Sequence, residues 1–389
     1  MKLKKIIDYV IESFSKSKNE ILELNGIRAI AIILVMFHHS FLAYKFTNLL
    51  SIKADNYLLK FFFKILENGR IGVDIFFVLS GFLIGGQLLK EIKTTGTLNF
   101  KKFYFKRILR IFPAYYFALI LVTIFFIEKI SIKEIISHLF YLQNYWLNIY
   151  EITWSLAVEE QFYIFLPFLL FIFRKNFKNA NCFCFAIFGL LIILPFYFRL
   201  LIFKNLHNIY DTQYISLKIF GAFHTRFDQL FIGVFIAFLY LNYKNLLINK
   251  YKIFYFLQFF LFIIFCFLIY YSGMNGSFYK IVLQFSLIGL VVGFFILSML
   301  LTKTFFNKIL SNNFFYFIAK ISYPMYLYHY FSIWSIHKED ISLTNNEFLN
   351  FFIYLTAIFA LSVLFALLSW LFIEYPFLKI KQKKCKFEC

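Results

Sequence analysis

Charged residues are scarce in this sequence of 389 residues, and those present are unevenly divided by sign. They make up 15% of the chain, with 40 Lys and Arg against 20 Asp and Glu, whereas about 25% of a soluble protein is charged. Hydrophobic residues reach 61%, and Phe alone occupies 61 positions. So little polar surface excludes a sizeable water-soluble domain. The composition predicts an integral membrane protein.

Cysteine is also scarce, and its spacing excludes both a disulfide framework and a metal signature. We therefore expect no bound metal. The net charge of +20 would suit a nucleic-acid binder. However, the basic residues occur mostly in short loops and tails, where they set topology and contact anionic lipid. We expect membrane lipids, and no nucleic acid, as partners. The five cysteines are Cys182, Cys184, Cys266, Cys385 and Cys389.

Apolar runs of roughly twenty residues recur along nearly the whole sequence. They predict an all-α, polytopic integral membrane protein with about ten transmembrane helices. We expect a cytoplasmic N-terminal segment at 1–23, a transmembrane domain at 24–378 and a basic cytoplasmic tail at 379–389. The excess of Lys and Arg in alternate loops places both termini in the cytoplasm. The predicted spans are 27–45, 71–89, 111–128, 154–173, 181–200, 227–242, 253–271, 281–301, 315–335 and 350–373, and a short or re-entrant helix at 134–149 would add one.

The first apolar run, LNGIRAIAIILVMFHHS, carries polar side chains where a membrane helix usually has none. Arg28 and His39 are separated by three helical turns plus about 20°, so both lie on one helix face. A charge at the bilayer centre costs at least about 2.5 kcal/mol, so such residues are rarely kept for packing alone. This face is typical of a transmembrane active site, although the sequence leaves open which of His38 and His39 acts.

Asp74 lies in the second span, GVDIFFVLSGFLI, at a depth similar to that expected for His39. A carboxylate beside an imidazole raises the basicity of the ring and orients it, as a general base requires. The alternative is a polar contact that only joins two helices.

Two arginines mark the start of the third span, in KRILRIFP. Arg107 and Arg110 share a helix face, and the fixed fork of a guanidinium suits phosphate. For the neighbouring Lys101 and Lys102, a role in topology and lipid contact is favoured.

Polar residues recur in three later spans. In TWSLAVEEQFY, Glu159 and Glu160 point about 100° apart, so that one faces the protein interior and the other the membrane interface. Arg226 and Asp228 begin the sixth span, and His329 lies in the ninth, where a lone histidine is more often a satisfied core group.

These residues fall into two expected layers across the membrane. The cytoplasmic layer would hold Arg28, Arg107 and Arg110, and the outer layer His39, Asp74, Glu159 and Asp228. This division favours a reaction between an anionic, phosphate-bearing donor from inside and an acceptor from outside.

The sequence resembles the acyltransferase-3 family of bacterial membrane proteins, which move acyl groups, commonly acetyl, from acyl-coenzyme A (acyl-CoA) to carbohydrates. The resemblance covers nearly the whole length. It implies an O-acyltransferase of the cytoplasmic (inner) membrane. The implied donor is an acyl-CoA, with acetyl-CoA as the expected choice, and the implied acceptor is a carbohydrate such as O-antigen, capsule or peptidoglycan. The matching motifs are, in order, LNGIRAIAIILVMFHH, GVDIFFVLSGFLI, KRILRIFP, TWSLAVEEQFY, TRFDQLFIGVFIA, SYPMYLYHY and IEYPF.

The resemblance also implies roles for individual residues. His39 is the implied catalytic base, and Arg28 completes its Arg-x10-His motif. The family usually has Asp where this sequence has Asn25, which removes a charge beside Arg28. Some relatives carry a C-terminal esterase-like domain, which we do not expect here. The other motif positions associated with activity are Asp74, Arg107, Arg110 and Glu159.

In the expected reaction, the cytoplasmic arginines bind the CoA phosphates, and His39 with Asp74 takes the proton of the acceptor hydroxyl. Arg226, Asp228 and His329 are expected to contact the substrate. A covalent acyl-enzyme stays open as a variant. The alternative function is a transporter or flippase for an anionic or lipid-linked substrate, and a third is a non-catalytic membrane partner.

Overall fold

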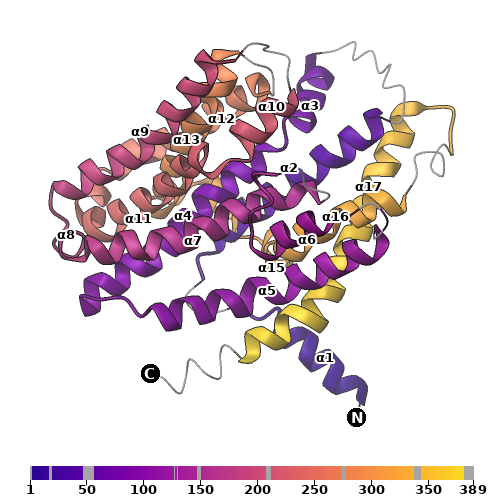
Figure 1. The fold of residues 1–389 in the computed structure, drawn as a ribbon, viewed down its shortest axis with the longest axis horizontal. Helices are drawn as coiled ribbons and strands as arrows, with labels where there is room; N and C mark the ends of the chain where they lie inside the picture. The colour runs from indigo at the N-terminus through magenta and orange to yellow at the C-terminus, as the bar shows by residue number, and fades with distance from the viewer. Residues whose placement is uncertain are drawn as a thin grey trace. The chain divides into compact units, whose positions relative to one another are not determined.

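The computed structural model describes residues 2–16, 20–46, 57–126, 128, 130–146, 150–206, 212–273, 277–336 and 343–380. Within these ranges all regular elements are helical (Figure 1), which confirms the predicted all-α fold. Nine helices of the described chain are long and apolar enough to cross a membrane. The protein is therefore a multi-pass membrane protein.

The helices form two compact units. Unit 1 comprises Met1–Gly72, Lys101–Phe125 and Ile309–Cys389, and unit 2 comprises Val73–Phe100 and Phe126–Lys308. Each unit therefore combines segments that are far apart in the sequence.

Unit 1 is organised around the first membrane helix, α2, which contacts α3, α15, α16 and α17. Helix α1 packs on the π-helical turn that follows α17, where the hydroxyl of Tyr9 donates to the carbonyl of Leu371 at 2.9 Å. The elements of unit 1 are α1 (Lys2–Ser13), α2 (Leu22–Phe46), α3 (Tyr57–Glu67), α5 (Phe100–Phe125), α15 (Asn313–Lys320), α16 (Ser322–Ser335), α17 (Glu347–Ser369) and the π-helical turn η7 (Trp370–Glu374).

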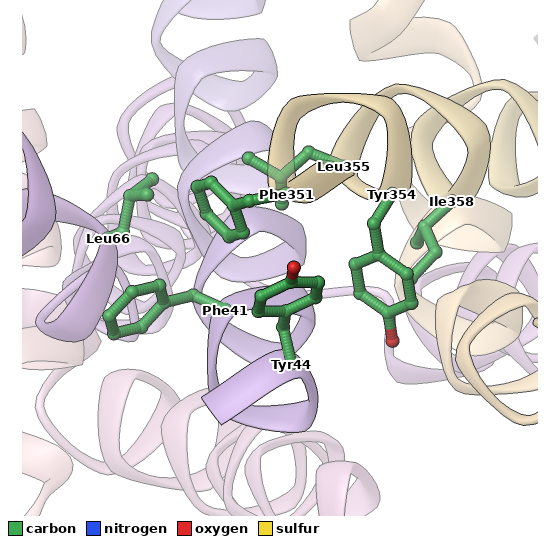
Figure 2. Packing of buried hydrophobic residues seen from close by; sticks show 7 residues of the cluster. All are labelled: Phe41, Tyr44, Leu66, Phe351, Tyr354, Leu355 and Ile358. Carbon is green, nitrogen blue, oxygen red and sulfur yellow. The ribbon is translucent and has the colours of Figure 1, made fainter. Parts of the chain in front are cut away.

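An aromatic and aliphatic cluster fixes one end of α2 in unit 1 (Figure 2). Its side chains come from α2, α3 and α17, and the Tyr44 hydroxyl also donates to the Glu347 carboxylate at 3.0 Å. Such burial holds the histidine-bearing helix in a defined position relative to α17. The cluster consists of Phe41, Tyr44, Leu66, Phe351, Tyr354, Leu355 and Ile358.

The predicted span 315–335 is made of two helices, α15 and α16, which meet at Ile321. Pro324 has no N–H to donate to the carbonyl four residues earlier, that of Lys320, so α15 ends there. The proline is tolerated in the first turn of α16, where no intrahelical donor is needed. The Ser322 hydroxyl donates to the Ala319 carbonyl at 2.9 Å, so one of the buried carbonyls at the break has a side-chain donor.

Unit 2 is organised around α11, which contacts α7, α9 and α13, and α12 packs on α13. The additional short helix considered at 134–149 is present as α6 over Ile132–Leu139. A capping box formed by Ser131 and Glu134 closes its N-terminus. The elements are α4 (Ile71–Thr95), α6 (Ile132–Leu139), η2 (Glu151–Thr153), α7 (Trp154–Ile172), α8 (Arg174–Asn179), α9 (Phe183–Lys204), α10 (Thr212–Ile215), η3 (Ser216–Phe220), η4 (Phe223–Thr225), α11 (Phe227–Ile248), α12 (Tyr251–Tyr271), η5 (Tyr279–Leu283), α13 (Gln284–Leu301) and α14 (Phe305–Leu310).

Helices α4 and α11 approach each other closely because glycines face the partner backbone. A Cβ atom added at Gly81 would overlap the carbonyl oxygen of Leu230, and one added at Gly233 would overlap that of Val78. Small residues at such positions let membrane helices pack through their backbones. This packing brings Asp74, near the start of α4, to the start of α11.

Candidate active site

Two histidines from distant parts of the sequence form a pair inside unit 1. Nδ1 of His39 on α2 lies 2.9 Å from Nε2 of His329 on α16, and Nδ1 of His329 lies 2.9 Å from the carbonyl oxygen of Tyr326. The Tyr330 ring meets both imidazoles edge-on, with its centroid 5.1 Å from each. His329 is fully buried, whereas His39 keeps part of its surface exposed.

The neighbouring His38 has a different environment. Its Nδ1 lies 3.1 Å from the carbonyl of Leu66 at the end of α3, and its side chain is buried. Consecutive helical side chains diverge by about 100°, so His38 fastens α2 to α3 while His39 faces α16. The structure therefore distinguishes the two residues, which sequence alone could not do.

Arg28 lies on the same helix as His39 and bonds to the residue that departs from the family pattern. Its Nη1 donates to Oδ1 of Asn25 at 3.1 Å, one turn earlier. The amide oxygen of Asn25 thus holds one end of the guanidinium. Arg28 remains partly exposed.

The two arginines of α5 differ in exposure. Arg107 is buried, with its guanidinium 6.0 Å from the centroid of the Phe103 ring, whereas Arg110 is exposed. Glu374 in η7 of the same unit is buried, and its carboxyl accepts a bond from the Ser369 hydroxyl at 3.3 Å. Glu374 belongs to the IEYPF motif and was not among the predicted site residues.

In unit 2, Asp74 belongs to a buried polar cluster at the start of α11. Its carboxylate accepts a bond from Arg226 and another from Nε2 of Gln229 at 3.0 Å. Arg226 also donates to the carbonyl of Phe220 at 3.0 Å, and its guanidinium carbon lies 4.2 Å from the centroid of the Phe285 ring. The cation is therefore paired, hydrogen-bonded and covered by an aromatic ring.

A second ion pair lies beside the first in unit 2. Arg199 of α9 donates to Oδ2 of Asp228 at 2.9 Å, and both side chains are fully buried. Ser286 donates to the same carboxylate oxygen at 2.6 Å, and Arg199 also donates to the carbonyl of Val282 at 3.1 Å. Sequence reasoning missed Arg199, although a single arginine inside an apolar span was a visible signal.

Glu159 of α7 is linked to α4 through a tyrosine in unit 2. The Tyr163 hydroxyl lies 3.2 Å from Oε2 of Glu159 and 2.6 Å from Oγ of Ser80. Glu159 and its neighbour Glu160 are both half-buried, so exposure does not separate them, although the tyrosine contact distinguishes Glu159.

The structure brings together His39 with His329, and Asp74 with Arg226. His39 and Asp74 belong to different units and have different partners within them. Asp74 as a helper of the base, and Arg226, Asp228 and His329 as substrate contacts, stay predictions. Within the described ranges, no group of three His, Cys, Asp or Glu side chains could hold a metal ion.

Residues 21–370 match the family model described as an acyltransferase domain. The chain belongs to this acyltransferase family. Among its curated relatives, a provisionally named O-acetyltransferase of Staphylococcus aureus is 33% identical over 342 residues, which cover 81% of this chain and 53% of the relative. This family member therefore spans about half the length of that relative.

Two further relatives carry peptidoglycan in their names. The peptidoglycan O-acetyltransferase OatA of Listeria monocytogenes is 30% identical over 194 residues, covering 45% of this chain and 28% of OatA. The provisionally named peptidoglycan O-acetyltransferase YrhL of Bacillus subtilis is 33% identical over 167 residues, covering 38% of this chain and 23% of YrhL. No solved structure matches this family member.

Proposed function

We propose that this protein is a membrane O-acetyltransferase that moves an acetyl group from cytoplasmic acetyl-CoA to a hydroxyl of an extracytoplasmic glycan. The pairing of His39 with His329 is the observation that carries the proposal. Titratable side chains in membrane helices are costly and usually functional. A partly exposed imidazole held by a buried one has the geometry of an oriented general base.

The reaction is a transfer between a thioester and an alcohol. His39 takes the proton of the acceptor hydroxyl as its oxygen attacks the thioester carbonyl. The carbon–sulfur bond then breaks, and the CoA thiolate takes that proton from His39. The products are a glycan ester and free CoA thiol, so neither a metal nor an oxidant is consumed.

The arginines of α2 and α5 are the proposed contacts for the donor. Acetyl-CoA carries several phosphate charges, and guanidinium groups offer paired donors in a fixed fork. Arg110 is exposed and Arg28 partly exposed, so both can meet a ligand without unfolding the helix. Buried Arg107 would support the same end of the site.

Peptidoglycan is the first acceptor we propose, because two relatives are named for it. We also propose that both chain termini face the cytoplasm of a bacterium and that the protein lies in the inner membrane. The contacts of α1 with Leu371 and Lys379, which follow α17, support a common side for the two ends. Lys and Arg in the loops favour the cytoplasmic side.

The test uses acetyl-labelled acetyl-CoA and membranes that contain the wild type, His39→Gln or His38→Gln. We expect label in an alkali-labile glycan ester with the wild type and with His38→Gln, because a glutamine amide can still donate to the Leu66 carbonyl. His39→Gln should lose about 10²–10⁴-fold of the rate, the usual contribution of a general base.

Other outcomes would overturn the proposal. Equal transfer by the wild type and His39→Gln would remove His39 from the chemistry. Glycan or lipid movement that is indifferent to acetyl-CoA, with no ester formed, would instead support the transporter alternative.

A further inference from the structure

The hydrogen bonds around the histidine pair determine which ring nitrogen carries each proton. Nδ1 of His329 lies 2.9 Å from the Tyr326 carbonyl oxygen. A carbonyl oxygen can only accept, so Nδ1 of His329 must hold a hydrogen. In the neutral ring, Nε2 of His329 is then bare and can only accept.

The same argument extends to His39. Its Nδ1 lies 2.9 Å from the bare Nε2 of His329, so Nδ1 of His39 must be the donor. The remaining nitrogen of a neutral His39, Nε2, then carries a free lone pair. Reversing the central bond would require a protonated His329, and a cation on this fully buried ring would carry a large desolvation cost.

We propose that His329 is a positioning residue that fixes His39 in the Nδ1–H tautomer and thereby makes Nε2 of His39 the basic nitrogen. For its catalytic consequence this inference rests on the proposed function. The role is the one that a carboxylate has in many catalytic triads, where a hydrogen-bond acceptor holds the base in the correct tautomer. Here a neutral imidazole, itself held by a helix carbonyl, is the acceptor.

The surroundings of the pair favour one orientation of the two rings. The imidazoles are tilted by 24° with centroids 5.0 Å apart, and Tyr330 packs edge-on against both. Helix α16 is tied to α17 by a buried bond of 2.9 Å between the hydroxyls of Ser362 and Ser332. Because Ser332 is one turn from His329, this bond limits rotation of α16 and keeps Nε2 of His329 directed at α2.

Nitrogen-15 NMR of the whole protein, labelled at histidine and held in nanodiscs, tests the tautomer directly. The His39 signals are assigned by their loss in His39→Gln. We expect the wild-type His39 to show a protonated Nδ1 and a bare Nε2. In His329→Phe, which has no acceptor, His39 should move toward the Nε2–H form. A wild-type His39 that is protonated at Nε2 would overturn the inference.

Transfer assays add a test by rescue. His329→Gln keeps an oxygen that can accept from His39 and an amide that can donate to Tyr326. We expect it to stay within about tenfold of the wild-type rate, the equivalent of one neutral hydrogen bond. His329→Phe should lose about 10²–10⁴-fold while its unfolding midpoint in detergent stays measurable. Equal losses in both variants would overturn the positioning role.

The two readouts separate this inference from the proposed function. An Nδ1–H tautomer on His39 in a protein that never releases CoA from acetyl-CoA would support the hydrogen-bond assignment and overturn the acetyltransferase. An Nε2–H tautomer on His39 in an active acetyltransferase would support the proposed function and overturn the hydrogen-bond assignment.

Discussion

Removing Arg226 should strongly destabilise unit 2, because its partner Asp74 would stay behind as a buried carboxylate. In Arg226→Met, Asp74 keeps the bond from Gln229 but loses the cation, and the Phe220 carbonyl loses the bond from Arg226. Breaking a buried ion pair by removing one partner costs about 3–5 kcal/mol. We expect a loss of this size in the free energy of unfolding.

A double-mutant cycle separates the pair from its surroundings. Asp74→Asn removes the carboxylate charge, so Arg226→Met should cost less in that background. The loss in the double variant should differ from the sum of the two single losses by about 2 kcal/mol, within the range measured for residues in direct contact. The assay is reversible unfolding in mixed detergent micelles, followed by tryptophan fluorescence.

The matched control is Arg174→Met in the same unit. Arg174 is partly exposed, donates to the Phe171 carbonyl at 3.0 Å and stacks on the Phe171 ring. It forms no ion pair with a described carboxylate. Its replacement should cost less than about 1 kcal/mol. An Arg226→Met variant as stable as this control, or a strictly additive cycle, would refute the reasoning.

Two further predictions concern packing and donor binding. Gly81→Val should destabilise the protein by about 1–3 kcal/mol, because the valine side chain would overlap the Leu230 carbonyl. The control is Gly189→Val on α9, which should be tolerated because an added Cβ meets no neighbouring element within 4 Å. Thermal unfolding compares the stability of the two variants. In steady-state assays, Arg110→Gln should raise the KM for acetyl-CoA at least about tenfold with little change in kcat. The control variant Lys102→Gln should leave KM and kcat unchanged. Equal effects of the two substitutions would contradict phosphate binding at Arg110.

Much of the fold could be predicted from the sequence because membrane helices are long apolar runs with a simple periodicity. The span at 315–335 was one exception, since its length hid a break that Pro324 imposes on the helix before it. The proline was visible, but an apolar run of this length conceals a break between helices. The third span was another exception, because its helix begins at Phe100 and not at residue 111.

The candidate site was predictable only in part. A charge inside an apolar run marks a residue as unusual, which identified His39 and Asp74. His329 and Arg226 were also among the predicted site residues, but their pairing with His39 and Asp74 could not be read from the sequence, because the partners are 290 and 152 residues apart. Such pairings arise from helix packing, for which one sequence contains no direct signal.

The most direct measurement of the central claim is CoA release by the purified protein in nanodiscs. Acetyl-CoA and soluble peptidoglycan fragments are supplied together, and free thiol and alkali-labile ester are counted in the same samples. We expect one ester per thiol released by the wild type, and a loss of both by about 10²–10⁴-fold in His39→Gln. Undiminished thiol and ester formation by a folded His39→Gln variant would contradict the account.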